Sequence, residues 1–239
     1  FFKSKWEELI LLDTNETAVE SSENSLRLAD AFSKVPPERI KFPKDNVNIP
    51  IFLSPTGCPI VEVKVNGQRH FFWLDTGANY SVLSSDIALE SGIDALSSEK
   101  IKALTGTIIK VDVFPILIDS IKLGNYSVYN HPAIMVQDFD LKFKFFSGGG
   151  GITKIDGILG WKFIQNLDLT INFVNKSIEI AKPKKTGSTN PNMYWLGCPI
   201  IRIANDEGTE LLFGLDLGAE KTTITSNIFN KVDFEKIYS

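Results

Sequence analysis

The sequence is poor in the residues that build metal centres and disulfide frameworks. It contains 2 cysteines and 2 histidines among 239 residues. A zinc site takes three or four nitrogen or sulfur ligands, and His70 and His131 belong to no such cluster. Cys58 and Cys198 alone are too few for a disulfide framework. The sequence therefore predicts no metal site and no cofactor.

A basic excess and long apolar runs are missing as well. Lys and Arg number 25 against 29 Asp and Glu, which gives a net charge of −4. A nucleic-acid-binding surface is normally basic, so no nucleic-acid partner is expected. Apolar runs such as Val113–Ile118 are short and interrupted, whereas a membrane helix needs about 20 apolar residues. With 43% hydrophobic residues, the composition predicts a globular protein without a membrane span.

Three regions follow one another along the chain. Residues 1–50 carry apolar residues at helical spacing in 4–12 and 22–35, and end in a proline-rich stretch. These patterns predict two short amphipathic helices and an extended linker. Residues 51–183 have strand patterns, and residues 184–239 begin with a polar linker before a second strand-like part. We therefore divide the chain at these bounds.

Strand signals are strongest near the start of the middle region. Val61, Val63 and Val65 alternate with other residues over 59–65, and Asn-Gly follows as a hairpin turn before a returning strand at 69–74. A short helix ended by Gly92 is predicted after it. Further strands are predicted in 107–118, 126–136 and 167–181.

One stretch of this region occurs twice. Residues 57–87 and 197–228 both contain Gly-Cys-Pro-Ile, a turn glycine, Leu-Asp-x-Gly-Ala and Ser-x-Ile, in step after one added residue. A match over a whole strand–turn–strand–loop unit predicts an internal duplication. Each copy places one carboxylate, Asp75 or Asp216, directly after a hydrophobic strand.

Paired carboxylates in this setting point to acid–base chemistry. A glycine after each Asp permits a tight turn, and burial raises the pKa of a carboxyl group. Two carboxylates about 3 Å apart share one proton, so that one acts as base on a water and the other as acid on a carbonyl oxygen. This chemistry requires no metal, histidine or serine nucleophile.

The stretch LDTGANYSVL, Leu74–Leu83, resembles the active-site stretch of retroviral-type (retropepsin-like) aspartic proteases. The likeness continues upstream through PIVEVKVNGQ and downstream to 156–180, where Ile-Leu-Gly is similar to the second signature of the family. It covers about residues 57–181 as one complete lobe. The resemblance implies a mainly β fold with a closed β-barrel lobe, preceded by a short helical segment and followed by the start of a second similar lobe.

The resemblance also implies roles for single residues. Asp75 is the catalytic Asp, and Asp216 is its counterpart in the second copy. The hydroxyl of Thr76 is expected to tie the two active-site loops together. The remaining residues shape or support the loop, with Ser81 hydrogen-bonded near the base of the site: Gly77, Ala78, Ser81, Ile158, Leu159 and Gly160.

A flap, a hairpin that closes over bound peptide, is expected between the two signatures. Its best match is residues 102–111, with Gly106 at the tip between Thr105 and Thr107. An ordinary β-turn is the other interpretation of this stretch. Asn79 is the further candidate for substrate contact, and it stands where the retroviral enzymes usually carry an acid.

The second copy departs from the pattern. Leu217 follows Asp216, so this copy lacks the tying hydroxyl, and it has neither a flap nor an Ile-Leu-Gly partner before the sequence ends. Two arrangements are therefore open. Asp75 pairs with Asp216 in one chain, or it pairs with Asp75 of a second copy in a homodimer.

Two functions follow from these alternatives. The first is an aspartic endopeptidase that acts on a peptide or protein substrate. The second is a protease-like module that binds peptides without cleaving them. Because the sequence starts with Phe rather than Met, we expect a processed or trimmed chain and favour an exported location, periplasmic, lipid-anchored or secreted.

Overall fold

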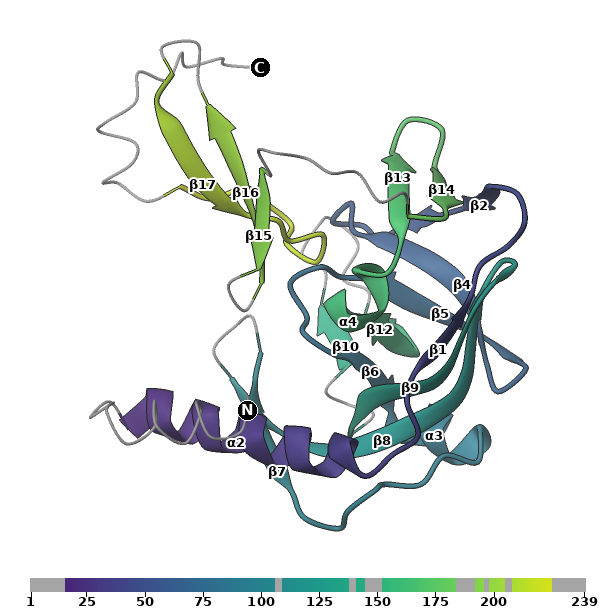
Figure 1. Cartoon of the computed structure of the whole chain (residues 1–239), viewed down its shortest axis with the longest axis vertical. Helices are drawn as coiled ribbons and strands as arrows, with labels where there is room; N and C mark the ends of the chain where they lie inside the picture. Colours follow the sequence, from purple (N-terminus) through teal and green to yellow (C-terminus); the bar gives the residue numbers. More distant parts are fainter. Residues whose placement is uncertain are drawn as a thin grey trace.

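Figure 1 shows the computed structural model of the chain, which describes residues 16–105, 109–137, 141–144, 152–183, 192–195, 198–204 and 208–224. Strands dominate these residues, and a helix precedes the first strand. A mainly β fold with a short helical segment before it is therefore confirmed. The helix predicted over 4–12 lies outside the described residues.

The main sheet has nine strands. They are β1 (Arg39–Lys41), β3 (Phe52–Leu53), β4 (Pro59–Val65), β5 (Gln68–Leu74), β6 (Ser81–Ser84), β7 (Ile101–Leu104), β8 (Lys110–Leu123), β9 (Tyr126–Val136) and β12 (Gly157–Leu159). Hydrogen-bonded neighbours follow the order β1-β9-β6-β12-β5-β4-β8-β7, β3 pairs with β4, and β8 also pairs with β9. The closed barrel itself stays a prediction.

Smaller elements complete the described chain. The helices after the first are α3 (Ser85–Glu90) and α4 (Trp161–Ile164). A two-stranded sheet pairs β10 (Lys142–Lys144) with β11 (Ile152–Lys154). A three-stranded sheet joins β13 (Asp168–Asn172), β14 (Ser177–Ala181) and β2 (Val47–Pro50). A further sheet joins β15 (Met193–Trp195), β16 (Pro199–Ala204) and β17 (Glu210–Gly214).

The hairpin of β4 and β5 forms as its sequence predicts. Val61, Val63 and Val65 face the core and are at most 1% exposed. Asn66 and Gly67 turn the chain with positive φ angles of 47° and 93°. Such a turn matches the twist of the two strands, and Asn and Gly adopt these angles readily. The hairpin ends at Leu74, directly before the first Asp loop of the repeat.

Strand β12 lies between β5 and β6, parallel to β5 and antiparallel to β6. It begins at Gly157, where a Cβ would lie 2.4 Å from the carbonyl oxygen of Val82 and 2.6 Å from the ring of Phe72. Only glycine leaves enough room for the backbone to pass here. This close approach brings the end of β12 against the loop that follows β5.

Helix α3 was also predicted, and its ends show why it forms. The Ser84 hydroxyl accepts the Ile87 N–H at 3.4 Å, which caps the first turn. Gly92 then takes a φ of 68°, a left-handed conformation that commonly follows the end of a helix. The helix therefore begins and ends where its capping residues stand.

Helix α2 (Glu16–Ser33) lies beside β7 in Figure 1 and packs against it. Its residue Leu28 is buried, and the ring of Phe32 lies 5.3 Å from the ring of Tyr80. Glu20 pairs with Lys110 at the start of β8. This helix corresponds to the one predicted over 22–35, and it joins the N-terminal segment to the β7–β8 hairpin.

The stretch predicted as an extended linker is extended, and it also contributes strands. Strand β1 pairs with β9, where Arg39 faces Tyr129. Strand β2 pairs with β14, where Ile49 faces Ile178. Ile49 and Ile178 are both core residues. The segment before the lobe is therefore fastened to two of its sheets.

The C-terminal sheet of β15, β16 and β17 stands to one side of the main sheet in Figure 1. The hairpin of β16 and β17 in this sheet repeats the pairing of β4 and β5. Ile200 faces Gly214 as Ile60 faces Trp73, and these are matching positions of the sequence repeat. The two hairpins therefore share one register, while an origin of the second by duplication stays a prediction.

Candidate active site

Asp75 follows the last residue of β5, and backbone N–H groups surround its carboxylate. The Asp75 N–H donates to the carbonyl oxygen of Leu159 at 3.0 Å, which fixes the start of the loop on β12. The carboxylate oxygen Oδ1 then accepts the N–H of Gly77 at 2.8 Å and of Ala78 at 3.3 Å. The loop therefore holds the side chain in one orientation.

Asp216 lies two residues after the end of β17, and its Oδ1 accepts the Gly218 N–H at 2.8 Å. The two loops face each other closely. A Cβ on Gly77 would lie 2.7 Å from the carboxyl carbon of Asp216, and a Cβ on Gly218 would lie 2.6 Å from that of Asp75. Each carboxylate thus lies against the glycine of the opposite loop. The structure brings the two Asp residues together within one chain.

Thr76 joins the two loops, the contact that the resemblance implied for it. Its hydroxyl donates to the carbonyl oxygen of Leu215 at 2.6 Å and accepts the N–H of Leu217 at 3.0 Å. Thr76 is 3% exposed, so water competes little for these groups. Leu217 occupies the matching position of the second loop and supplies no hydroxyl. The connection is therefore made from the Thr76 side.

Two further contacts hold the C-terminal unit against the lobe. The Cys58 thiol donates to the carbonyl oxygen of Gly218 at 3.4 Å. The ring of Trp195 stacks on that of Trp161, with centroids 5.6 Å apart and planes 7° from parallel. Cys58 and Cys198 are both free thiols.

The pKa of Asp75 is raised from 3.8 to about 6. Burial is the largest cause, and the charge of Asp216 is the second. A hydrogen bond between the two carboxyl side chains acts in the same direction, while the N–H groups of Gly77 and Ala78 oppose the shift. Between about pH 3.8 and pH 6 the pair therefore retains a proton that an isolated Asp would lose.

The residues after β12 support the Asp75 loop from below. The N–H groups of Trp161 and Lys162 donate to the carbonyl oxygens of Ala78 at 2.7 Å and Asn79 at 3.1 Å. These donors belong to the first turn of α4, where N–H groups have no partner inside the helix. A Cβ on Gly160 would lie only 2.3 Å from the carbonyl oxygen of Tyr80, so glycine is required there.

Ser81 lies at the base of this arrangement and is fully buried. It accepts the Gly160 N–H at 3.3 Å, and its Oγ lies 2.9 Å from Nε2 of His131. Glu38 hydrogen-bonds Nδ1 of the same imidazole. Glu38 and His131 were not among the predicted site residues, because neither lies in a motif and nothing in the sequence links them to Ser81.

An apolar row crosses the main sheet at Trp73, two residues before Asp75. Strand pairing places four more apolar residues beside it, so that the row across the sheet is Ile60, Trp73, Ile158, Val82 and Ile134. Leu28 and Phe32 of α2 pack on these residues together with Tyr80.

The predicted flap is a hairpin as far as the structure describes it. Leu104 faces Lys110 across β7 and β8, and the Thr105 N–H donates to the Ile109 carbonyl oxygen at 2.9 Å. Gly106 and Thr107 lie outside the described residues. The other predicted contact residue, Asn79, is exposed beside the Asp75 loop.

Metal ligands do not gather anywhere in the described part of the chain. No group of three or more His, Cys, Asp or Glu side chains is placed to hold an ion within the residues shown as ribbon in Figure 1.

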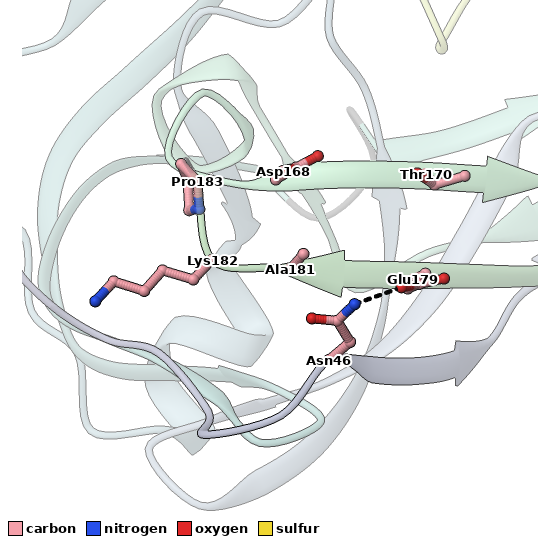
Figure 2. Close-up of a pocket in the computed structure, with 7 residues that line it drawn as sticks. All are labelled: Asn46, Asp168, Thr170, Glu179, Ala181, Lys182 and Pro183. Carbon is pink, nitrogen blue, oxygen red and sulfur yellow. Dashed lines mark hydrogen bonds between the residues drawn. The ribbon is translucent and has the colours of Figure 1, made fainter. Parts of the chain in front are cut away.

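Figure 2 shows a pocket along β13 and β14, where Asn46 donates to Glu179 at 2.7 Å. Its volume is about 460 Å³. Neither Asp75 nor Asp216 lines this pocket. None of the described helices is long and apolar enough to cross a membrane.

Comparison with protein families matches residues 61–163 to the family described as aspartyl protease. This part of the chain is similar to the aspartyl protease family. The match runs from β4 through the Asp75 loop and the Ile-Leu-Gly signature to α4, so it includes the β12 and α4 residues that bind the Asp75 loop. The fold class predicted from the sequence, a retropepsin-like acid-protease lobe, is confirmed.

Solved structures of aspartic proteases are similar to the chain. A retropepsin-like aspartic protease from Rickettsia conorii is 18% identical, with 60% of this chain and 91% of that chain covered and a TM-score of 0.38. An aspartic proteinase from Irpex lacteus is 14% identical, with 78% and 67% covered and a TM-score of 0.49. The retroviral protease-like domain of Ddi1 from Leishmania major is 11% identical, with 55% and 98% covered and a TM-score of 0.36. No curated protein matches the sequence.

Proposed function

We propose that the protein is an aspartic endopeptidase in which Asp75 and Asp216 of one chain form the catalytic pair. The observation that carries this proposal is the packing of each carboxylate against the glycine of the opposite loop. The tie that Thr76 makes to Leu215 and Leu217 supports it, because it holds the two loops in register. The similarity of residues 61–163 to the aspartyl protease family supports a protease function in general.

The proposed reaction needs only the two carboxyl groups and a water. The ionised carboxyl takes a proton from the water, whose oxygen bonds to the carbonyl carbon of the peptide. The protonated carboxyl gives its proton to the carbonyl oxygen. The C–N bond then breaks as the nitrogen receives the proton that the first carboxyl took from the water. A hydroxyl of the tetrahedral intermediate gives its proton to the second carboxyl as the new carboxylic acid product forms, and the pair returns to its starting state. Asp75 suits the role of proton holder because its pKa is raised to about 6.

A peptide or protein in extended form is the substrate that fits the surroundings of the pair. The β7–β8 hairpin is the proposed flap that covers a bound chain, as the flap of the family does. Thr105, Gly106, Thr107 and Asn79 remain the proposed contacts to its backbone.

Cleavage of a library of unstructured peptides, followed by mass spectrometry between pH 4 and pH 7, tests the proposal. We expect cleavage by the wild type and a loss of at least about 100-fold in Asp75→Asn, which is the range for removal of a general acid or base. The matched control is Asp94→Asn, because Asp94 is an exposed Asp remote in sequence from both loops. Equal cleavage by wild type and Asp75→Asn would refute the proposal.

The same experiment separates the alternatives left open by the sequence. A homodimeric pair made of two Asp75 residues does not need Asp216, so Asp216→Asn would then keep its activity. A module that only binds peptides would retain them without cleavage in wild type and variants alike. The missing hydroxyl at Leu217 is the feature that favours these readings, and the close approach of Asp216 to Gly77 opposes both.

A further inference from the structure

A buried chain of hydrogen bonds leads from the N-terminal segment to the base of the Asp75 loop. It passes from Glu38 through the imidazole of His131 to the hydroxyl of Ser81, and from there to the N–H of Gly160. Ser81 and His131 are 0% exposed, and the Glu38 side chain is 19% exposed. Water therefore has little access to any bond of the chain.

The donors and acceptors of this chain fit together in one direction. The Gly160 N–H donates to Ser81 Oγ. The direction of the two imidazole contacts depends on the tautomer of His131, and we assign the Ser81 hydroxyl as donor to Nε2 and Nδ1–H as donor to Glu38. The imidazole is then neutral with its proton on Nδ1. A ring with protons on both nitrogens would leave the Ser81 hydroxyl proton with no acceptor among the described residues.

Serine, histidine and an acid in hydrogen-bonded order are also the arrangement of a nucleophilic hydrolase. Burial excludes that role here, because a nucleophile must reach its substrate and Ser81 is 0% exposed. Ser81 is instead oriented inward, toward Gly160. The chain of bonds therefore serves to hold the structure around the site rather than to attack a substrate.

Residues 35–50 form an extended strap that brings Glu38 to His131. This strap is fixed on both sides of the contact. After Glu38, strand β1 pairs with β9. Before it, the Pro37 carbonyl oxygen accepts the side-chain N–H of Asn130 at 3.1 Å, and Asn130 takes a φ of 55° next to His131. Burial, and secondly the charge of Glu38, raises the pKa of Tyr126, which agrees with an inward orientation of the Glu38 carboxylate.

Aromatic packing restrains the imidazole as well. The ring of Phe163 in α4 meets the His131 ring edge-on, with centroids 5.6 Å apart and an angle of 88°. Phe163 is itself fully buried. The position of His131 is therefore set by Glu38 at one ring nitrogen, by Ser81 at the other and by the perpendicular ring of Phe163.

We propose that Glu38 and His131 are positioning residues of the active site. Glu38 keeps the proton of His131 on Nδ1, and His131 then holds the Ser81 hydroxyl so that it accepts the Gly160 N–H. Gly160 in turn precedes the α4 donors that bind the carbonyl oxygens of Ala78 and Asn79. The strap before the lobe thereby stabilises the geometry of Asp75. This inference rests on the proposed peptidase function.

Three variants test the role of Glu38 in the full chain, with the best peptide from the cleavage library as substrate. Glu38→Ala removes the acceptor of Nδ1–H, and we expect kcat to fall about tenfold, less than the roughly 100-fold that a 1 Å displacement can cause. KM should stay within about twofold, because no substrate contact is removed. Glu38→Gln keeps a carbonyl acceptor and should restore kcat. Glu90→Ala removes an exposed carboxylate as control.

The tautomer of His131 supplies a readout that does not depend on activity. We expect ¹⁵N NMR of the imidazoles to show a neutral ring protonated on Nδ1 in the wild type and in Glu38→Gln. In Glu38→Ala the proton should move to Nε2. A wild-type ring protonated on Nε2 would overturn the inference even where Glu38→Ala fails to fold.

The outcomes separate this inference from the peptidase proposal. Cleavage by the wild type with equal kcat losses in Glu38→Ala and Glu38→Gln would refute the positioning role and leave the peptidase proposal intact. A rise in KM without a fall in kcat would refute it as well. No cleavage by the wild type would refute the peptidase function and the positioning role with it.

Discussion

Replacing Asp75 with Asn should change how the stability of the protein depends on pH. In the folded chain the pKa of Asp75 is about 6, against 3.8 for a free side chain. Between these values the folded protein binds more protons at this position than the unfolded chain does. The contribution of Asp75 to the free energy of unfolding is therefore fully present below about pH 3.8. It is lost as the pH rises through about 6.

The size of the effect follows from the shift. One pKa unit corresponds to about 1.4 kcal/mol, so a shift of about two units predicts that ionised Asp75 lowers the free energy of unfolding by up to about 3 kcal/mol. Asn carries no charge at any pH and escapes this penalty. The difference in unfolding free energy between Asp75→Asn and the wild type should therefore grow by about 3 kcal/mol from pH 3 to pH 8.

Guanidinium unfolding at several pH values measures this difference. The slope of the unfolding free energy against denaturant concentration should be the same for both proteins, so that only the midpoint concentration of unfolding differs. Asp94→Asn again serves as control, and its unfolding free energy should follow that of the wild type at every pH. A difference between Asp75→Asn and the wild type that stays constant from pH 3 to pH 8 would refute the account of Asp75 as a buried carboxyl beside Asp216.

Two further substitutions test the support of the pair. Thr76→Val removes the hydroxyl bound to Leu215 and Leu217. Denaturation should show a loss of about 1–3 kcal/mol in the free energy of unfolding, and cleavage assays should show a lower kcat. Thr76→Ser keeps the hydroxyl and should retain the stability and the kcat of the wild type. Gly160→Ala would place a Cβ 2.3 Å from the Tyr80 carbonyl oxygen, so the loop must move. This movement should lower the free energy of unfolding by about 1–3 kcal/mol and remove most of the activity. Cleavage at the wild-type rate would contradict this expectation.

The sequence predicted those parts of the fold that local chemistry determines. Alternating valines and the Asn66-Gly67 turn specify the β4–β5 hairpin, and Ser84 with Gly92 specifies α3. The repeat also identified Asp216 as the residue to compare with Asp75. Local pattern was enough in these cases because each element is stabilised mainly by its own residues and their immediate neighbours.

Contacts between distant segments were beyond the reach of sequence reasoning. Whether Asp216 approaches Asp75 depends on how the C-terminal sheet packs on the lobe, for example through Trp161 and Trp195, and no local pattern encodes that packing. Glu38 is 93 residues from His131 in the chain, and its strap looked like a plain linker. Pairing of β1 with β9 and the hydrogen bond from Asn130 to Pro37 bring the two side chains together.

Cleavage by Asp216→Asn tests the central claim most directly. The account predicts that this variant, folded and compared at the same concentration as the wild type, loses at least about 100-fold in kcat/KM on the best peptide, because it lacks half of the catalytic pair. Wild-type cleavage by Asp216→Asn would contradict the account, since Asp75 would then have its catalytic partner somewhere other than in the second loop of its own chain.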